Sequence, residues 1–298
     1  MSAESDKIRR EWKISDAIRD RGLATPEDII RYDDITYGDS VAEQKLDVYR
    51  PREQAGKKLP VIISVHGGGW VYGDKELYQY YCMSLAQHGF AVINFTYRLA
   101  PEHKFPAQLE DTNQVVYWMM EHAEAYGFDT THVFTVGDSA GGHLSGLYAL
   151  ICTNPAYAAK YDMKPPKGFA PTAIALNCGV YHITMEARTD HEKQTLTLMT
   201  DLLPGQVTPE TLAEIHIAPY ITEDFPPTFV MTATGDFLIA QPQILTKKLT
   251  EKNVPFISRL YGDARHELGH VFHCNMHLPE AALCNTEECS FFKEFIRA

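Results

Sequence analysis

A serine between two glycines, in the order Gly-Asp-Ser-Ala-Gly at residues 137–141, is the feature that most constrains how this chain can fold. Residues 132–136 before it are an apolar run typical of a buried strand, and residues 142–150 after it have the spacing of a helix. A serine on so sharp a strand-to-helix turn adopts a strained backbone conformation, which pushes its hydroxyl out of the sheet. Three fixed residues in five also occur by chance, but the flanking strand and helix favour a nucleophile elbow centred on Ser139.

A second glycine-rich segment follows a second apolar run. Residues 61–65 are apolar without alternation, as expected of a strand covered on both faces, and residues 66–70 then read His-Gly-Gly-Gly-Trp. Three glycines in a row have no side chains to shield their N–H groups, so a main-chain donor can approach a substrate oxygen closely. Because the N–H of Ala140 at the helix start also favours negative charge, the two segments together predict an oxyanion hole. A phosphate-binding loop is the alternative, but the Lys-Ser or Lys-Thr that it needs is missing.

A serine hydroxyl becomes a good nucleophile only when a histidine accepts its proton and a carboxylate orients that histidine. On an elbow of this type, the acid and then the histidine follow the serine along the chain. Asp236 closely follows the apolar run 228–233, and we predict that it is the acid. Asp263 and Glu267 are weaker rivals, because they lie too close to the candidate histidines to come from a separate strand.

The histidine is expected on the loop after the last apolar run, residues 256–261. The candidates there are His266, His270, His273 and His277. We predict His270, with His266 as the second choice. Residues 266–270 also match the HExxH pattern of zinc proteases, in which a helix places both imidazoles on one face. Gly269 weakens a helix and no strong third ligand follows, so we predict neither a metal nor a cofactor.

Strands and helices alternate along the chain, which predicts an α/β fold with a mostly parallel sheet and helices on both faces. The expected strands are residues 45–49, 61–65, 90–94, 132–136, 172–178, 228–233 and 256–261. Helices are expected at residues 7–20, after Thr25, and at 107–125. No linker divides the chain, so we expect one domain, residues 1–298, with a small helical cap from about 1–30 and 181–223. An extra structural helix pair is the alternative for residues 181–223.

Composition limits the partners of this chain. A formal net charge of −12 argues against nucleic acid or an anionic membrane surface as a partner. The N-terminal residues lack the apolar core of a secretory signal, and no run is long enough to span a bilayer, so we expect a cytoplasmic protein. Its six cysteines are scattered, which predicts free thiols, several of them buried, rather than a disulfide framework. A homo-oligomer is compatible with the sequence.

The two glycine motifs together resemble those of the bacterial members of the hormone-sensitive lipase family of α/β-hydrolases. Segments between them also match the family: Tyr-Arg-Leu-Ala-Pro-Glu at 97–102, Phe-Pro-Ala at 105–107 and Leu-Glu-Asp at 109–111. The likeness extends from about Leu46 to the C-terminal end and is weaker over 181–223.

The resemblance implies a catalytic triad of Ser139, Asp236 and His270, in which residues 270–272 match the family's His-x-Phe. The family usually has a proline at or near position 237, where this chain has Phe237, and this departure leaves Asp236 as the expected acid. The oxyanion donors that the resemblance implies are the N–H groups of Gly68, Gly69 and Ala140, with Gly67 shaping the loop.

We therefore expect a serine carboxylesterase that hydrolyses acetyl to medium-chain esters of small molecules through an acyl-enzyme. Deacetylase or feruloyl-type esterase activity and amidase activity of the formamidase type are alternatives on the same triad. Alternatives of another class are an HExxH zinc metalloprotease and a non-catalytic small-molecule receptor, although receptors on related folds have lost the histidine. The residues expected to shape the substrate pocket are Trp70, Tyr72, Asp138 and Phe237.

Overall fold

Eight strands form one sheet in the computed structural model of the chain, which describes residues 2–296. The order across the sheet is β1-β2-β4-β3-β5-β6-β7-β8. β2 runs antiparallel to β1 and to β4, and all other neighbouring pairs are parallel. The strands are Ile29–Thr36 (β1), Lys45–Pro51 (β2), Leu59–Val65 (β3), Ala91–Phe95 (β4), Phe128–Asp138 (β5), Ala173–Asn177 (β6), Thr228–Ala233 (β7) and Phe256–Tyr261 (β8). The predicted α/β fold is confirmed.

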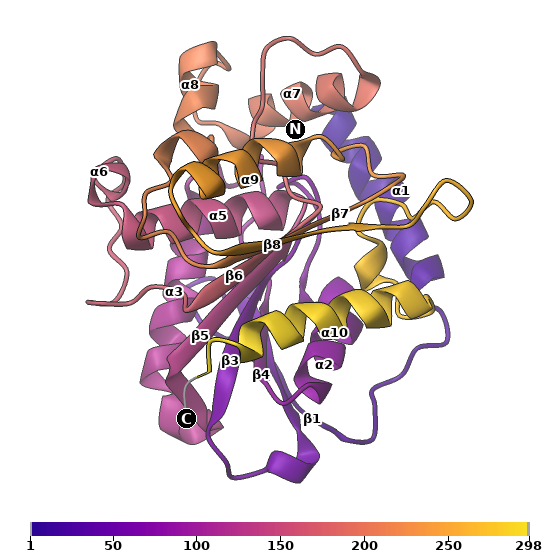
Figure 1. Cartoon of the computed structure of the whole chain (residues 1–298), viewed down its shortest axis with the longest axis vertical. Coiled ribbons are helices and arrows are strands. Elements are labelled where there is room, and N and C mark those ends of the chain that lie inside the picture. Colours follow the sequence, from indigo (N-terminus) through magenta and orange to yellow (C-terminus); the bar gives the residue numbers. More distant parts are fainter. Residues whose placement is uncertain (1, 297–298) are drawn as a thin grey trace.

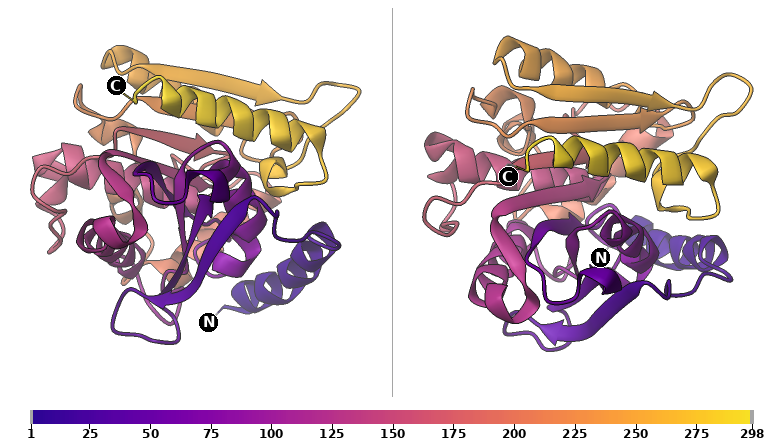
Figure 2. Two further views of the ribbon diagram at one scale, coloured as in Figure 1. Left: turned by 90° about the horizontal axis from the view of Figure 1, so that it is seen from below. Right: turned by 60° about the horizontal axis from the view of Figure 1, so that its bottom comes forward.

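Helices cover both faces of the sheet (Figures 1 and 2). α2 and α10 pack on one face, and α3, α5 and α9 pack on the other. The helices are Ala3–Arg19 (α1), Lys75–Gln87 (α2), Ala107–Glu121 (α3), Ala123–Tyr126 (α4), Ala140–Thr153 (α5), Pro155–Ala158 (α6), Asp190–Leu202 (α7), Pro209–Glu214 (α8), Gln241–Glu251 (α9) and Pro279–Lys293 (α10). The helix expected at 107–125 is therefore α3 followed by α4, and it ends at Gly127 in a left-handed conformation.

The N-terminal edge of the sheet differs from the prediction. All seven expected strands form, but β1 is not predicted by the sequence, and the helix expected after Thr25 is wrong. Residues 25–28 instead lead through a turn, in which the N–H of Ile29 donates to the carbonyl of Pro26 (3.1 Å). Proline suits a turn as well as a helix start, and the pairing of β1 with β2 decides between them.

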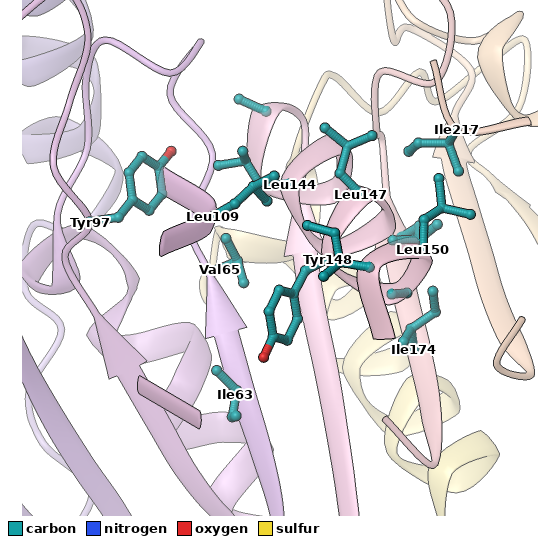
Figure 3. Close-up of a cluster of buried hydrophobic side chains, with 14 of the residues drawn as sticks. Ile63, Val65, Tyr97, Leu109, Leu144, Leu147, Tyr148, Leu150, Ile174 and Ile217 are labelled. Carbon is teal, nitrogen blue, oxygen red and sulfur yellow. The ribbon is translucent and has the colours of Figure 1, made fainter. Parts of the chain in front are cut away.

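β3 shows why its sequence is apolar without alternation. Ile62 belongs to the hydrophobic layer under α2 and α10. Ile63 and Val65 belong to the opposite layer, together with Leu144 and Leu147 of α5 (Figure 3). Because helices cover both faces of this strand, neither face offers an exposed position over residues 61–65, and even the polar Ser64 is buried.

α1 lies beside α7, which comes from the insertion between β6 and β7 (Figure 1). Ser2 caps α1 by accepting the N–H of Ser5 (3.1 Å). The hydroxyls of Ser2 and Ser5 donate to the carboxylate of Asp201 in α7, at 2.6 and 2.5 Å. Arg9 donates to the carbonyl of Val71 (2.7 Å), which ties the middle of α1 to the loop after β3. The N-terminal helix is thus attached both to the insertion and to the sheet.

The structure also answers two expectations from the sequence, one about the cysteines and one about membrane-spanning helices. All six cysteines are free, and five of them are buried, as expected from their positions in apolar runs. Within residues 2–296, the length and apolarity needed to cross a bilayer do not occur together in any helix.

Replacing Gly141 with alanine should strongly destabilise the fold. A Cβ there would lie well inside van der Waals contact with the main-chain carbonyl oxygens of Val65 and His66, which cannot move aside without disturbing the sheet. We expect the free energy of unfolding to fall by at least about 3 kcal/mol, as in strongly overpacked sites, measured by urea denaturation. Gly205→Ala is the matched control, because nothing lies within 4 Å of a Cβ at that position. Equal stability of the two variants would contradict this account.

Candidate active site

Ser139 lies on the turn between β5 and α5. Its backbone has φ of 51° and ψ of −118°, a combination that residues other than glycine rarely adopt. The N–H of Ser139 donates to the carbonyl of Asn177 at the end of β6 (2.9 Å), which holds the turn against the sheet. A Cβ on Gly137 would meet the carbonyl of Gly141, so the turn closes only because both positions lack a side chain.

Asp236 and His270 come from the loops after β7 and β8 and share a hydrogen bond. Nδ1 of His270 lies 2.8 Å from Oδ1 of Asp236. The two loops are joined next to this bond, where the N–H of Gly235 donates to the carbonyl of Leu268 (2.9 Å). When Nδ1 donates to the carboxylate, Nε2 is left as the acceptor of the neutral ring. The pair therefore has the arrangement of a base and its orienting acid.

The carboxylate of Asp236 is buried and well supplied with donors. Thr232 Oγ1 donates to Oδ2 (2.9 Å), and the N–H of Leu238 donates to Oδ1 (2.8 Å). Burial by itself raises the pKa of Asp236, but the hydrogen bond and charge of His270, together with the N–H of Leu238 and the thiol of Cys178, outweigh it and leave the pKa below its ordinary value. The acid is therefore ionised at neutral pH and can stabilise a positive charge on His270.

The rival acids and the rival histidine lie elsewhere. Asp263 accepts two N–H groups of its own turn, at 2.7 and 2.9 Å, and Glu267 is exposed. Nε2 of His266 pairs with Glu280 at 3.1 Å. The HExxH segment is a loop rather than a helix, so the imidazoles of His266 and His270 do not share a helix face. The arrangement that a zinc protease needs is therefore not formed by these residues.

One group of possible metal ligands includes the candidate base. Ligand atoms of Cys178, Asp236 and His270 lie within 4.8 Å of one another. Burial raises the pKa of the Cys178 thiol well above its ordinary value, and a protonated thiol is a poor ligand. Because the carboxylate and the imidazole already bond to each other, the group fits proton transfer better than metal binding.

The glycine loop after β3 is braced by a buried histidine. Nδ1 of His66 bonds to the carbonyl of Gly67 (2.7 Å), and its ring stacks on Tyr97 with centroids 3.9 Å apart. Burial lowers the pKa of His66 to about 4, so the ring is neutral at physiological pH. The loop then turns sharply, with φ of 111° at Gly68 and 60° at Gly69, values that suit glycine.

Main-chain donors at this end of the sheet are left without acceptors. Within residues 2–296, the N–H groups of Gly68 and Gly69 donate no hydrogen bond. Ala140 is the first residue of α5, where an N–H has no partner inside the helix. The N–H of Gly67 differs, because it donates to the hydroxyl of Tyr78 (2.9 Å).

Ser139, His270 and the glycine loop line one cavity of about 410 Å³. Ser139 is half-buried and lines this cavity, and its hydroxyl makes no hydrogen bond to any group in residues 2–296. α1 adds a wall that the motifs did not predict. Its side chains in the lining are Trp12, Ser15, Asp16 and Arg19. The sequence indicated a helix at residues 7–20 and a cap from about 1–30, but no spacing rule says which side chains of such a helix face the site.

Some of the residues expected to shape the substrate pocket line the cavity, and others lie elsewhere. Tyr72 and Asp138 line the cavity. Trp70 is instead 2% exposed and packs edge to face against His143 of α5, with ring centroids 5.4 Å apart. A large aromatic ring at the end of a buried loop gains more by entering the core than by facing a partly open cavity.

Phe237 lies against the candidate base rather than in the cavity lining. Its ring centroid is 4.3 Å from that of His270. His191 of α7 stacks on Phe237 at the same centroid distance, 4.3 Å. Phe237 therefore links the insertion to the histidine loop.

Replacing Asp138 with asparagine should change how stability depends on pH. Burial raises the pKa of Asp138 from 3.8 to about 6, so the folded state favours the neutral carboxyl. This contribution is fully present below pH 3.8 and is lost as the pH rises through about 6. Asparagine does not titrate, so the free energy of unfolding of Asp138→Asn relative to the parent should rise between about pH 4 and 7.5 by on the order of 3 kcal/mol. A difference that stays constant across this range in urea titrations would contradict the charge effect.

The chain is similar to several proteins that are named esterases. The family model described as BD-FAE matches residues 46–252. The esterase LipC of Mycobacterium tuberculosis is 29% identical over 243 residues, which cover 80% of this chain and 57% of that protein. The ethyl acetate hydrolase of Pseudomonas putida is 34% identical over 148 residues, covering 49% of this chain and 46% of that protein. The chain spans about half the length of the curated relatives it matches.

A solved structure is similar over nearly the whole chain. Esterase B from Lactobacillus rhamnosis superposes with a TM-score of 0.87 at 28% identity, covering 98% of this chain and 95% of that one. The same esterase has also been solved with a tributyrin phosphonate inhibitor.

Proposed function

The chain belongs to the BD-FAE family of α/β-hydrolases, and on that basis we propose that it is a serine carboxylesterase. The observation that carries the proposal is a convergence on one cavity. A strained serine, a histidine paired with a buried carboxylate, and Gly68, whose main-chain N–H has no acceptor within residues 2–296, all line this cavity. These are the parts that acyl transfer to a hydroxyl requires.

In the first half of the reaction, Oγ of Ser139 attacks the ester carbonyl carbon while Nε2 of His270 takes the hydroxyl proton. Asp236 stabilises the imidazolium that forms. The carbonyl oxygen becomes an oxyanion, and the free N–H groups of Gly68, Gly69 and Ala140 are its proposed donors. When the tetrahedral intermediate collapses, the alcohol leaves with the proton from the histidine, and the acyl group stays on the serine.

In the second half, a water molecule takes the place of the alcohol. His270 accepts a proton from the water as its oxygen attacks the acyl carbon, and the same N–H groups stabilise the second oxyanion. Collapse returns the proton to Oγ of Ser139 and releases the carboxylic acid. Every step uses the substrate, water, and side chains and main-chain N–H groups of this chain.

We propose short acyl chains as the preferred substrates. The cavity of about 410 Å³ is of a size that holds a small ester. The relatives point in the same direction, because one is named an ethyl acetate hydrolase and esterase B binds a tributyrin phosphonate. Trp12 and Tyr72 meet edge to face, with centroids 6.0 Å apart, and form a rigid aromatic wall that limits chain length.

We further propose that α1 and the insertion act together as a small cap on one domain. Trp12 of α1 lines the cavity, and α1 is held to Asp201 of α7 by two serine hydroxyls. Phe237 connects α7 to His270. A helix that supplies part of the cavity wall excludes water from the reacting groups and narrows the choice of substrate.

Replacing Ser139 with alanine should abolish hydrolysis. Without the nucleophile, kcat for 4-nitrophenyl butyrate should fall by at least about 10⁴-fold, because only binding and the oxyanion hole remain. A fluorophosphonate probe should label the parent and not the variant, as read by mass spectrometry. Ser145→Ala is the matched control, since Ser145 is buried in the same helix and is absent from the cavity lining. Labelling at another residue, or a largely active Ser139→Ala, would remove the proposed mechanism.

A series of 4-nitrophenyl esters from acetate to decanoate tests the proposed chain length. We expect kcat/KM to be highest between acetate and butyrate and to fall roughly 10-fold or more by decanoate, because the added methylenes meet the aromatic wall. Trp12→Ala should flatten this decline. A chelator present throughout distinguishes the serine esterase from the zinc metalloprotease alternative, because a zinc enzyme should lose its activity in the chelator. An enzyme that prefers decanoate would contradict the proposed substrate class, and a chain that labels but hydrolyses no ester would point to an amide substrate.

A further inference from the structure

A buried tyrosine joins the residue before the nucleophile to the glycine loop. Tyr78 lies in α2 and is 7% exposed. Its hydroxyl donates to Oδ2 of Asp138 (2.8 Å) and accepts the N–H of Gly67 (2.9 Å). A Cβ on Gly67 would collide with both of these oxygen atoms, so the three groups are in close contact. A phenol donates and accepts at once, which is what a link between an N–H and a carboxylate needs.

We propose that Tyr78 is a positioning residue, which holds the glycine loop against the Ser139 turn and thereby sets where the oxyanion donors stand relative to the nucleophile. The inference rests on the proposed function, because it concerns the oxyanion hole of that reaction. It assigns a role to α2, which carries none of the motif residues.

The two peptide planes on either side of the Gly67 Cα support this role. Tyr78 holds the first plane through the N–H of Gly67. His66 holds the second plane through the carbonyl of Gly67, at 2.7 Å. That second plane also contains the N–H of Gly68, which in a planar trans peptide points opposite to the carbonyl. With both planes held, the Gly68 N–H has one direction, and this N–H is a proposed oxyanion donor.

The chemistry of the link makes it strong. Burial, with the nearby charge of Asp138, raises the pKa of Tyr78 well above its ordinary value, so the phenol stays protonated and donates. A hydrogen bond to a carboxylate in a buried place is stronger than one between neutral groups, and linked bonds polarise one another. The link therefore resists displacement of the loop while charge develops on the substrate oxygen.

A second phenol of α2 supports the other side of the nucleophile. Tyr81, one helical turn after Tyr78, donates to Glu288 (2.9 Å). The other oxygen of Glu288 accepts the side-chain amide of Asn177 (2.5 Å), and the carbonyl of Asn177 accepts the N–H of Ser139. One face of α2 thus reaches both flanks of the turn, but only Tyr78 reaches the glycine loop.

Tyr78→Phe is the decisive variant. We expect kcat for 4-nitrophenyl butyrate to fall about 10- to 100-fold, somewhat less than when a whole oxyanion donor is removed, while KM changes less than about 3-fold. The rate of labelling by a fluorophosphonate should fall by a similar factor, because that reaction also builds negative charge in the oxyanion hole. A merely structural role would not lower kcat and the labelling rate together while leaving KM unchanged.

Tyr49→Phe is the matched control. Tyr49 is a fully buried tyrosine whose hydroxyl also donates to a buried carboxylate, that of Asp47 (2.8 Å), and it lies in β2 outside the cavity lining. The Tyr49→Phe variant should lose about as much stability as Tyr78→Phe, but its kcat should stay that of the parent. Should Tyr78→Phe fail to fold, Asp138→Ala tests the same link from its other end, and Asp138→Asn, which keeps an acceptor, should lose less activity than Asp138→Ala.

The outcomes separate this inference from the proposed function. A parent that neither hydrolyses esters nor reacts with the fluorophosphonate would remove the proposed function itself. An active parent whose folded Tyr78→Phe variant keeps a kcat within about 2-fold of Tyr49→Phe would overturn the role of Tyr78 alone. A loss that appears in KM instead of kcat would also overturn it, because it would place Tyr78 in substrate binding.

Discussion

The close approach of two stretches of backbone, at the start of α5 and at the end of β3, is the constraint on which the rest of the site depends. Gly141 lies so near the carbonyl groups of Val65 and His66 that no side chain fits between them. This contact places the nucleophile turn directly beside the loop that begins at His66. The strained backbone of Ser139 persists because the sheet on one side and the helix on the other leave no relaxed alternative.

Three buried carboxylates surround this turn, and their partners give them different properties. Asp236 faces a histidine that can carry a positive charge, and its pKa is lowered in spite of burial. Asp138 accepts a hydrogen bond from a phenol, and Glu288 accepts hydrogen bonds from a phenol and an amide. These neutral donors do not offset burial, so burial raises the pKa of Asp138 to about 6 and that of Glu288 to about 7. Of the three carboxylates, Asp236 therefore has the surroundings that an acid needs in order to remain ionised. The other two suit a role as hydrogen-bond acceptors that hold neighbouring groups in place.

Much of the fold was predictable because it follows from local patterns. The largely apolar runs of the central parallel strands reflect burial on both faces, and these strands lie within a few residues of the predicted ranges. β1 was missed because residues 29–36 are polar enough to pass for a loop, and only pairing with β2 makes them a strand. The assignment of Trp70 to the pocket failed for a related reason, since a motif position does not say whether a side chain points to a cavity or to the core.

The sequence by itself determined the alternation of strands and helices from β2 onward, the serine turn and the glycine loop, and it favoured Asp236 and His270 over their rivals. Each of these depends on neighbouring residues or on the order in which strands end, so each leaves a local pattern. Only the tertiary structure decided which side chains of α1 line the cavity, that Phe237 lies between His191 and His270, and that Tyr78 joins Asp138 to Gly67. These are contacts between residues far apart in the chain, and long-range contacts come from packing whole elements together, which no short pattern records.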